Sequence, residues 1–344
     1  MKLIRVGKLF AGLFFAALAA GASAQTITSL DFPGALATTA FAINDAGVIL
    51  GIYGDTSKAA HFYVRSNTGK YTSFDIPGAS PAAPGMGINK FGVIAGYDID
   101  PGKVHHGFVR TAKGAIKTFD VPGAGKLSGQ GTFVSAIDNA GTIVGFYFDS
   151  NNKHHGYVRS NAGTIKTFEV VGAGHTGTAP ASINLAGTVA GTWKDIHGVW
   201  HGFMRTATGT ITTYDAPGGT NTYGGLINTG GTIAGWYLGA TDAVHGFVRS
   251  AGGAFTSFDA PGAGTTSGEG TVTLAINTAG VVAGPYTDSA GIEHSYVRAA
   301  NGTITDFDPT GATQTEAWGI NTPGDVVGYY TDASTVVHGF LRTP

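Results

Sequence analysis

A five-residue phrase that begins with His and ends with Arg occurs seven times, and this repetition restricts the possible folds more than any other feature of the chain. An Ile-Asn or Ile-Asp pair recurs in step with it, and successive pairs lie 44 to 49 residues apart. One unit therefore repeats along the chain and leaves no segment over for a second domain. The phrases read HFYVR, HGFVR, HGYVR, HGFMR, HGFVR, HSYVR and HGFLR, starting at 61, 106, 155, 201, 245, 294 and 338.

Each unit contains four short runs of β-branched and aromatic residues, which are typical of β-strands. In the copy at 133–173 the runs are FVSAID, TIVGFYF, HGYVR and TIKTFEV, separated by turns rich in Gly and Asn. No stretch of useful length has the periodicity of an α-helix. Four antiparallel strands in about 46 residues are typical of one propeller blade. The sequence therefore predicts an all-β, seven-bladed β-propeller with four strands per blade, and an open β-solenoid is the alternative.

The two ends of the chain suggest how the ring closes. The segment ITSLDFPGA (27–35) matches a fourth strand such as IKTFDVPGA (116–124), whereas the chain stops at HGFLRTP (338–344), just after a third strand. The last blade thus lacks one strand and the N-terminal region has one to spare. We therefore predict that the N-terminal strand closes the last blade, which removes exposed sheet edges.

The recurring HGF tripeptide, together with IN-x-x-G and FD-x-PG, resembles the bacterial extracellular repeat proteins that are named for a His-Ala-Phe motif, the HAF repeat family. The resemblance covers all seven units, although this chain mostly has Gly where the family name has Ala. The resemblance implies export and a repeat fold. It implies no particular activity.

The first 24 residues have the three parts of a bacterial export signal. Lys2, Arg5 and Lys8 form a positive region, 9–22 is an apolar stretch of signal-peptide length, and 22–24 is an A-x-A cleavage site. No later segment is apolar enough to span a membrane. We therefore predict a signal peptide at 1–24, a single propeller domain at 25–344, and export to the periplasm or the cell exterior without membrane insertion.

Composition excludes several classes of partner and chemistry. Without the signal peptide the chain has 17 Lys and Arg against 22 Asp and Glu, a net charge of −5. Nucleic acids require a basic surface, so they are not expected as partners, and an anionic membrane surface is a poor fit. The chain has no Cys, which excludes disulfides, thiol nucleophiles and thiolate metal sites.

The repeated His and Arg are predicted to be structural, because an enzyme does not need seven copies of its catalytic group. Acidic residues end each fourth strand and follow most second strands, so a His–Asp hydrogen bond is expected in each blade. A metal in each loop is the alternative, but no loop has the calcium-binding pattern and 98–102 only approaches it. No metal or cofactor is predicted. The predicted framework residues are His61, His106, His155, His201, His245, His294, His338, Arg65, Arg110, Arg159, Arg205, Arg249, Arg298 and Arg342.

Loop variation indicates which face of the ring is free to bind a partner. With strands a to d numbered from the centre outward, the a–b turns are uniform, whereas the b–c and d–a loops vary in length and content. Two d–a loops are longer than the others, at 123–132 and 262–271. Binding residues usually lie on loops held by a rigid scaffold. A site is therefore expected on the b–c and d–a face, near the central opening.

Residues that do not follow the repeat are the candidates for ligand binding. Aromatic rings with amides suit sugar stacking or peptide contact, and packing of the Trp residues between blades is the alternative. His105 and His154 double the framework His and are expected to be exposed in loops. The ligand-binding candidates are Trp193, His197, Trp200, His175, Tyr223, Gln130 and Trp318.

No catalytic signature stands out, and no catalytic residue is assigned. H-E-x-x-H, G-x-S-x-G and P-loop patterns are absent. If the chain is an enzyme, the candidates are the glutamates outside the repeat, Glu269, Glu293 and Glu316, two of which would have to converge. We predict a non-enzymatic, monomeric module that binds a glycan or an envelope protein. A polysaccharide hydrolase or lyase and a purely structural surface or matrix protein are the alternatives.

Overall fold

The computed structural model describes residues 25–81 and 87–344, so the predicted signal peptide lies outside the described residues. All 30 regular elements in these two ranges are β-strands. A search of the same residues for a helix long and apolar enough to cross a membrane finds none. The all-β class predicted from the sequence is confirmed.

Three sheets have four strands each, paired in the orders β2-β3-β4-β5, β15-β16-β17-β18 and β28-β29-β30-β1. Their strands are β2 (Ala37–Ile43), β3 (Ile49–Gly54), β4 (Ala60–Arg65), β5 (Tyr71–Phe74), β15 (Ala173–Ile183), β16 (Val189–Asp195), β17 (Trp200–Arg205), β18 (Ile211–Tyr214), β28 (Ala312–Ile320), β29 (Val326–Asp332), β30 (Val337–Thr343) and β1 (Thr26–Leu30).

Two further sheets have nine strands each, and each consists of two antiparallel sets that are joined by one parallel pair, Gly131 with His105 or Val244 with Gly270. The first contains β6 (Ser80–Pro81), β7 (Gly87–Ile88), β8 (Ile94–Ile99), β9 (His105–Arg110), β10 (Ile116–Phe119), β11 (Gly131–Ile137), β12 (Ile143–Phe148), β13 (His154–Arg159) and β14 (Ile165–Phe168). The second contains β19 (Asn221–Ile227), β20 (Ile233–Leu238), β21 (Val244–Arg249), β22 (Phe255–Phe258), β23 (Gly270–Thr271), β24 (Ala275–Ile276), β25 (Val282–Thr287), β26 (Glu293–Arg298) and β27 (Ile304–Phe307).

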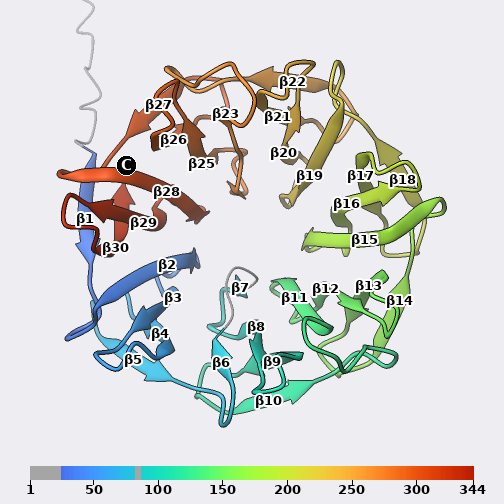
Figure 1. Ribbon diagram of the computed structural model, residues 1–344, viewed down its shortest axis with the longest axis horizontal. Coiled ribbons are helices and arrows are strands. Elements are labelled where there is room, and N and C mark those ends of the chain that lie inside the picture. The colour runs from blue at the N-terminus through green and yellow to red at the C-terminus, as the bar shows by residue number, and fades with distance from the viewer. Residues whose placement is uncertain (1–24, 82–86) are drawn as a thin grey trace, which may run out of the picture.

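The sheets stand around a central opening in a propeller-like ring (Figure 1). Strands β2, β11, β15, β19 and β28 surround the opening, and strands such as β5, β10 and β14 lie at the perimeter. The repeated phrase forms the third strand from the centre in every repeat. Because strands run along the axis of the ring, the His of the phrase lies toward one rim and the Arg toward the other.

The N-terminal strand closes the ring as the sequence predicts. Strand β1 pairs antiparallel with β30 at the outer edge of the last sheet, with Thr26 opposite Thr343 and Leu30 opposite Gly339. Leu30 is 1% exposed and packs in a cluster with Ile49 of the first repeat. The two ends of the chain therefore share one sheet and one part of the core.

A bulge in the innermost strands explains why the second strand of the repeat carries a Gly. In β11 the register shifts between Val134 and Ala136, which pushes a carbonyl toward the neighbouring strand. A Cβ atom on Gly145 of β12 would lie 2.0 Å from the carbonyl oxygen of Phe133. Only Gly leaves room for that carbonyl, which also accepts a hydrogen bond of 3.1 Å from the Tyr157 hydroxyl.

The repeated Arg joins neighbouring repeats by cation–π contacts, because its guanidinium lies over an aromatic ring in the outer strand of the preceding repeat. The outer strand before the first repeat is β1, which ends in Leu30, so Arg65 lies instead over Tyr71 of its own sheet at 5.7 Å. The six contacts between repeats are Arg110 with Phe74 (4.5 Å), Arg159 with Phe119 (4.6 Å), Arg205 with Phe168 (4.8 Å), Arg249 with Tyr214 (4.9 Å), Arg298 with Phe258 (4.8 Å) and Arg342 with Phe307 (5.1 Å).

Candidate functional site

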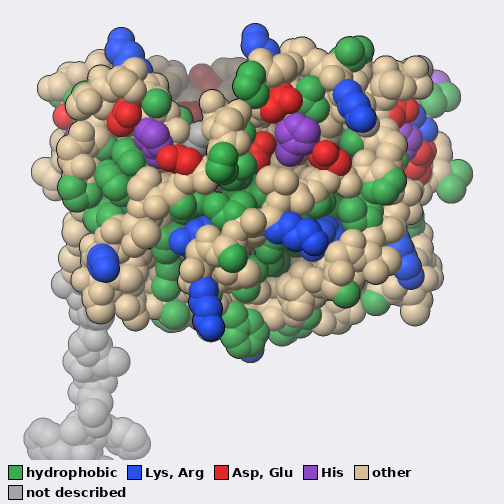
Figure 2. Space-filling model, turned by 90° about the horizontal axis from the view of Figure 1, so that it is seen from below, with side chains coloured by type: hydrophobic (Ala, Val, Ile, Leu, Met, Phe, Trp, Pro, Cys, Tyr) green, Lys and Arg blue, Asp and Glu red, His purple; other side chains and the backbone are tan. Residues whose placement is uncertain are grey.

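The repeated His side chains are held by acids on the wall of the ring. Figure 2 shows His side chains flanked by Asp and Glu near one rim, with Lys and Arg both at that rim and in a lower band. The Nδ1 atom of each repeated His lies against the carboxylate that follows a fourth strand. The pairs are His61 with Asp75, His106 with Asp120, His155 with Glu169, His201 with Asp215, His245 with Asp259, His294 with Asp308, and His338 with Asp31.

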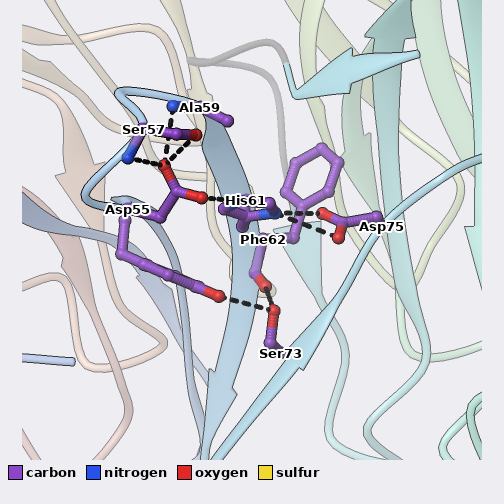
Figure 3. A network of polar contacts seen from close by, with 8 residues as sticks. Asp55, Ser57, Ala59, His61, Phe62, Ser73 and Asp75 are labelled. Atoms are coloured by element: carbon purple, nitrogen blue, oxygen red, sulfur yellow. Dashed lines mark hydrogen bonds and ion pairs between the residues drawn. The ribbon is translucent and has the colours of Figure 1, made fainter. Parts of the chain in front are cut away.

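Figure 3 shows this arrangement in the first repeat. His61 lies between two carboxylates, with Nδ1 3.0 Å from Asp75 and Nε2 3.3 Å from Asp55. Burial opposes protonation of His61, but the hydrogen bonds and charges of the two acids raise its pKa overall. Hydrogen bonds from Ser57 and from the backbone N–H of Ala59 lower the pKa of Asp55 to about 2. The His and its acids thus tie the b–c loop to the fourth strand.

An aromatic ring from the second strand packs on the repeated His in six repeats. Trp193 is one of these rings and lies 4.6 Å from His201, half-buried in a cluster with Val144 and Phe203. The structure therefore places this binding candidate within the packed framework and not on a loop. The other five pairs are Tyr53 with His61, Tyr147 with His155, Tyr237 with His245, Tyr286 with His294 and Tyr330 with His338.

In each of the two long d–a loops, one polar side chain, Gln130 or Glu269, accepts a hydrogen bond from a backbone N–H of the same loop. Gln130 is 1% exposed, and its Oε1 accepts a hydrogen bond from the N–H of Leu127 while its Nε2 donates to Asn152. In the later loop, the Glu269 carboxylate accepts from the N–H of Thr266 in the same way. Both side chains close their own loops, so Gln130 is not available to a ligand.

Two further ligand-binding candidates are His197 and His175. His197 lies in the exposed turn after β16, where its backbone N–H donates to Asp195. His175 belongs to β15, but its side chain lies outside the described residues.

His105 and His154, which precede the repeated His, are not exposed as expected: His105 stacks on Phe133 at 4.1 Å. Burial lowers the pKa of both, that of His154 to about 4, so their rings serve packing in the neutral form.

Three aromatic residues form a ladder between the fourth and fifth repeats. Trp200 lies 5.6 Å from Tyr223, and Tyr223 stacks on Trp236 at 3.9 Å with an angle of 17° between the rings. All three are partly exposed. Tyr223 and Trp236 line a hollow of about 240 Å³ whose lining includes Gly224 and Gly225. Trp200 and Tyr223 are ligand-binding candidates predicted from the sequence, whereas Trp236 is not among those candidates.

Glu293 and Glu316 are brought together, as a paired-carboxylate site requires, while Glu269 remains in its loop. In two other repeats the residue before the repeated His contacts an aromatic ring of the next repeat: His105 contacts Phe133, and Trp200 contacts Tyr223. At the sixth repeat this contact joins two carboxyl groups. Burial, the charge of Glu316 and a hydrogen bond with Glu316 raise the pKa of Glu293. Glu293 therefore resists ionisation more than a free glutamate does.

Two aromatic side chains fix the orientation of Glu316. The Tyr329 hydroxyl donates to Oε1 at 2.7 Å, and the Trp318 indole donates to Oε2 at 3.1 Å. Burial and the hydrogen bond with Glu316 raise the pKa of Tyr329, so its hydroxyl keeps the donated proton. Phe41 of the first repeat packs edge-on against Trp318 at 5.6 Å. The acid pair is thus held at the junction where the ring closes.

Two cavities lie along the axis of the ring. One, of about 250 Å³, is lined by residues of the innermost strands and by Trp318. The other, of about 200 Å³, is lined by the Ile-Asn and Ile-Asp pairs of all seven repeats. Over residues 25–81 and 87–344, no group of three or more His, Asp or Glu side chains is arranged to hold a metal ion.

Comparison with known proteins identifies the fold. Virginiamycin B lyase from Staphylococcus aureus aligns with a TM-score of 0.61 at 15% identity, over 93% of this chain and 99% of that one. A puromycin hydrolase gives 0.60 at 11% identity, over 90% of this chain and 54% of that one. A lectin from Burkholderia pseudomallei gives 0.52 at 11% identity, over 89% and 96% of the two chains.

No family model and no curated protein matches the sequence. At 10 to 15% identity the structural similarities show the fold alone. The chain therefore has an all-β, β-propeller-like fold, and its site has to be understood from its own residues.

Proposed function

We propose that the chain is an exported seven-bladed β-propeller that binds a glycan at the centre of the b–c and d–a face. The blade count is supported by the seven copies of the repeat and by strand pairing, in which each nine-stranded sheet divides into two sets at a single parallel pair. A hydroxyl-rich ligand suits a site that combines exposed ring surfaces with a few fixed polar groups.

The observation that carries the proposal is the aromatic ladder beside the hollow. Trp200, Tyr223 and Trp236 form a row of rings, and the rings of Tyr223 and Trp236 border a hollow with glycines in its lining. The third repeat has a comparable stack of Phe133 on Phe146 at 4.9 Å, but no Trp takes part in it.

The glycines of the lining are required by packing, since a Cβ on Gly224 would lie 2.6 Å from the Tyr214 hydroxyl and a Cβ on Gly225 would lie 2.6 Å from the Cβ of Ala181. The neighbouring rings offer a surface on which a sugar ring can stack. The hollow is small, of about 240 Å³, which suits one residue of a longer glycan.

The carboxyl pair can anchor a bound glycan. Glu293 and Glu316 lie close enough to interact, since the neighbouring Glu316 raises the pKa of Glu293. Carboxyl groups at a binding surface offer hydrogen bonds to the hydroxyls of a sugar.

Replacing Trp236 with Ala is expected to weaken glycan binding at least tenfold, because truncating a central aromatic anchor removes more than about 1.4 kcal/mol of binding free energy. A glycan array would first identify a ligand for the mature chain, and isothermal titration calorimetry would then compare the variants. Trp193→Phe is the matched control, since Trp193 packs on His201 away from the ladder.

Equal affinity of the Trp236→Ala variant and the parent would remove the basis for binding at the ladder. Failure of the array to retain the protein on any glycan would contradict the glycan proposal itself. Release of shortened sugars during incubation would instead support the enzyme alternative. Thermal unfolding of each variant would show that loss of binding is not loss of fold.

A further inference from the structure

Seven residues at the end of the axis opposite the proposed glycan site form a nearly complete hydrogen-bonded ring. In six repeats the Asn of the Ile-Asn pair donates from Nδ2 to the backbone carbonyl of the equivalent residue in the next repeat. The last of these bonds joins the two ends of the chain. The bonds are Asn44 to Asn89 (3.0 Å), Asn89 to Asp138 (3.2 Å), Asn184 to Asn228 (3.2 Å), Asn228 to Asn277 (3.2 Å), Asn277 to Asn321 (3.0 Å) and Asn321 to Asn44 (3.3 Å).

Asp138 interrupts the ring because a carboxylate has no N–H to donate. Its Oδ1 accepts from the N–H groups of Ala140 and Thr142 at 2.8 Å, just as Oδ1 of Asn89 accepts from its own turn. The two side chains therefore have the same orientation. By the equivalence of the repeats, Oδ2 of Asp138 stands where Nδ2 of Asn89 stands, and the carbonyl that corresponds to the acceptor of Asn89 is that of Asn184.

Two acceptors thus meet where every other junction has a donor. Asp138 and Asn184 are each 7% exposed, and among the described residues Oδ2 of Asp138 has no donor partner. The Asn184 carbonyl accepts from the N–H of Gly187 and receives no amide from the third repeat. A carboxylate oxygen and a carbonyl oxygen that face each other repel unless a cation or a proton lies between them.

The junction opens onto the polar axial cavity of about 200 Å³, which Asp138 and Asn184 both line. Two other charged residues, Asp45 and Lys90, line the same cavity. Oδ1 of Asp45 is engaged by the N–H of Thr322 at 2.8 Å. The ammonium of Lys90 lies over the ring of Phe91 at 5.0 Å. The unmatched carboxylate therefore faces a space large enough for several water molecules.

We propose that this junction binds a hard metal cation of the calcium type, coordinated by Oδ2 of Asp138 and the carbonyl oxygen of Asn184. Carboxylate and carbonyl oxygens are the ligands that Ca²⁺ prefers, and its flexible coordination allows water from the cavity to complete the shell. With one carboxylate the affinity falls in the weak range of extracellular calcium modules, about 10⁻⁴ to 10⁻³ M. The site uses none of the residues of the proposed glycan site.

Thermal unfolding of the full chain with and without CaCl₂ tests the proposal. After EDTA treatment, Ca²⁺ at about ten times its dissociation constant is expected to raise the unfolding temperature of the parent by about 2–4 °C in a saturable way. The Asp138→Asn variant should gain nothing from Ca²⁺. In EDTA it should unfold at a higher temperature than the parent, because its amide completes the ring.

Asp45→Asn is the matched control, because it removes one carboxylate from the same cavity but keeps Oδ1 for the N–H of Thr322. It should respond to Ca²⁺ as the parent does, and calorimetric titration should detect binding to both. The proposal is wrong if Asp138→Asn responds to Ca²⁺ like the parent or if the parent does not respond. The proposal is also wrong if the unfolding temperature of the parent changes with pH but not with Ca²⁺, and Asp138→Asn removes the pH effect. A proton would then bridge the junction in place of a cation.

Discussion

Replacing Leu30 with Ala is expected to lower the free energy of unfolding by about 2–5 kcal/mol, the range for removing a fully buried Leu side chain. Leu30 ends the strand that closes the ring and is 1% exposed. It packs against Ile49 of the first repeat and Val327 of the last. The cavity left by the substitution would loosen the contact that holds the two ends of the chain together. Urea-induced unfolding followed by tryptophan fluorescence would measure the change.

Thr28→Ala is the control for this substitution, because Thr28 lies in the same strand and pairs with Leu341, but its side chain is exposed. It should change the free energy of unfolding by less than about 0.5 kcal/mol. If Leu30→Ala is no more destabilising than Thr28→Ala, then docking of β1 contributes little and the fold does not depend on closure by the N-terminal strand.

Replacing Asp98 with Asn is expected to raise the free energy of unfolding by about 2–3 kcal/mol at pH 7. Asp98 lies opposite His106 at the position where the other six repeats have an aromatic ring packed on the His. It is 2% exposed, and its Oδ2 has no hydrogen-bond partner. Burial raises its pKa from 3.8 to about 6, although the charge of His106 partly offsets that effect. An ionised Asp98 therefore destabilises the native state.

The sign of the pH dependence follows from this shift. The native state holds the Asp98 proton more tightly than the unfolded chain does, so the penalty is absent below about pH 4 and develops as pH rises through about 6. Asp100, Asp120 and His106 also face this group and titrate nearby. The difference in unfolding temperature between parent and Asp98→Asn should thus be small at pH 4 and large at pH 7. A difference that does not vary with pH would contradict the assignment.

The Asp98→Tyr variant distinguishes the effect of the buried charge on stability from the effect of the aromatic ring that the second repeat lacks. It removes the same carboxylate and supplies the ring that packs on the His in the first repeat, where Tyr53 lies 5.1 Å from His61. It should therefore stabilise the fold at pH 7 at least as much as Asp98→Asn. If the tyrosine variant is less stable than the asparagine variant, the second repeat has no room for the ring.

Repetition made most of the framework predictable. Seven copies of one phrase identify a strand even though any single copy, such as HGFVR at 106–110, suggests a His–Arg site. The spare fourth strand at the N-terminus predicted the pairing of β1 with β30, which the structure confirms. These features depend on hydrophobic alternation and turns within one unit, which are local and readable.

The binding candidates were less predictable because the class of a side chain does not say whether it packs or binds. Trp193 follows the Gly of the second strand at the same distance as Tyr53 and Tyr147, and that register could have assigned it to the framework. Trp236 lies one residue earlier in its strand, and its ring joins the ladder with Tyr223. In a strand, a shift of one residue moves a side chain to the other face.

The amino-acid sequence by itself determined the strands, their order within each repeat and the way the ends meet, because these depend on residue pattern over a few tens of positions. Only the tertiary structure decided that Glu293 meets Glu316 while Glu269 does not, that Asp98 is buried without a partner, and that Asp138 leaves a gap in an axial ring. Each of these depends on the packing around one residue that departs from the repeat. For the glutamates and for Asp138 that packing involves a neighbouring repeat, and the repeat pattern does not say which departures from it will lie in contact.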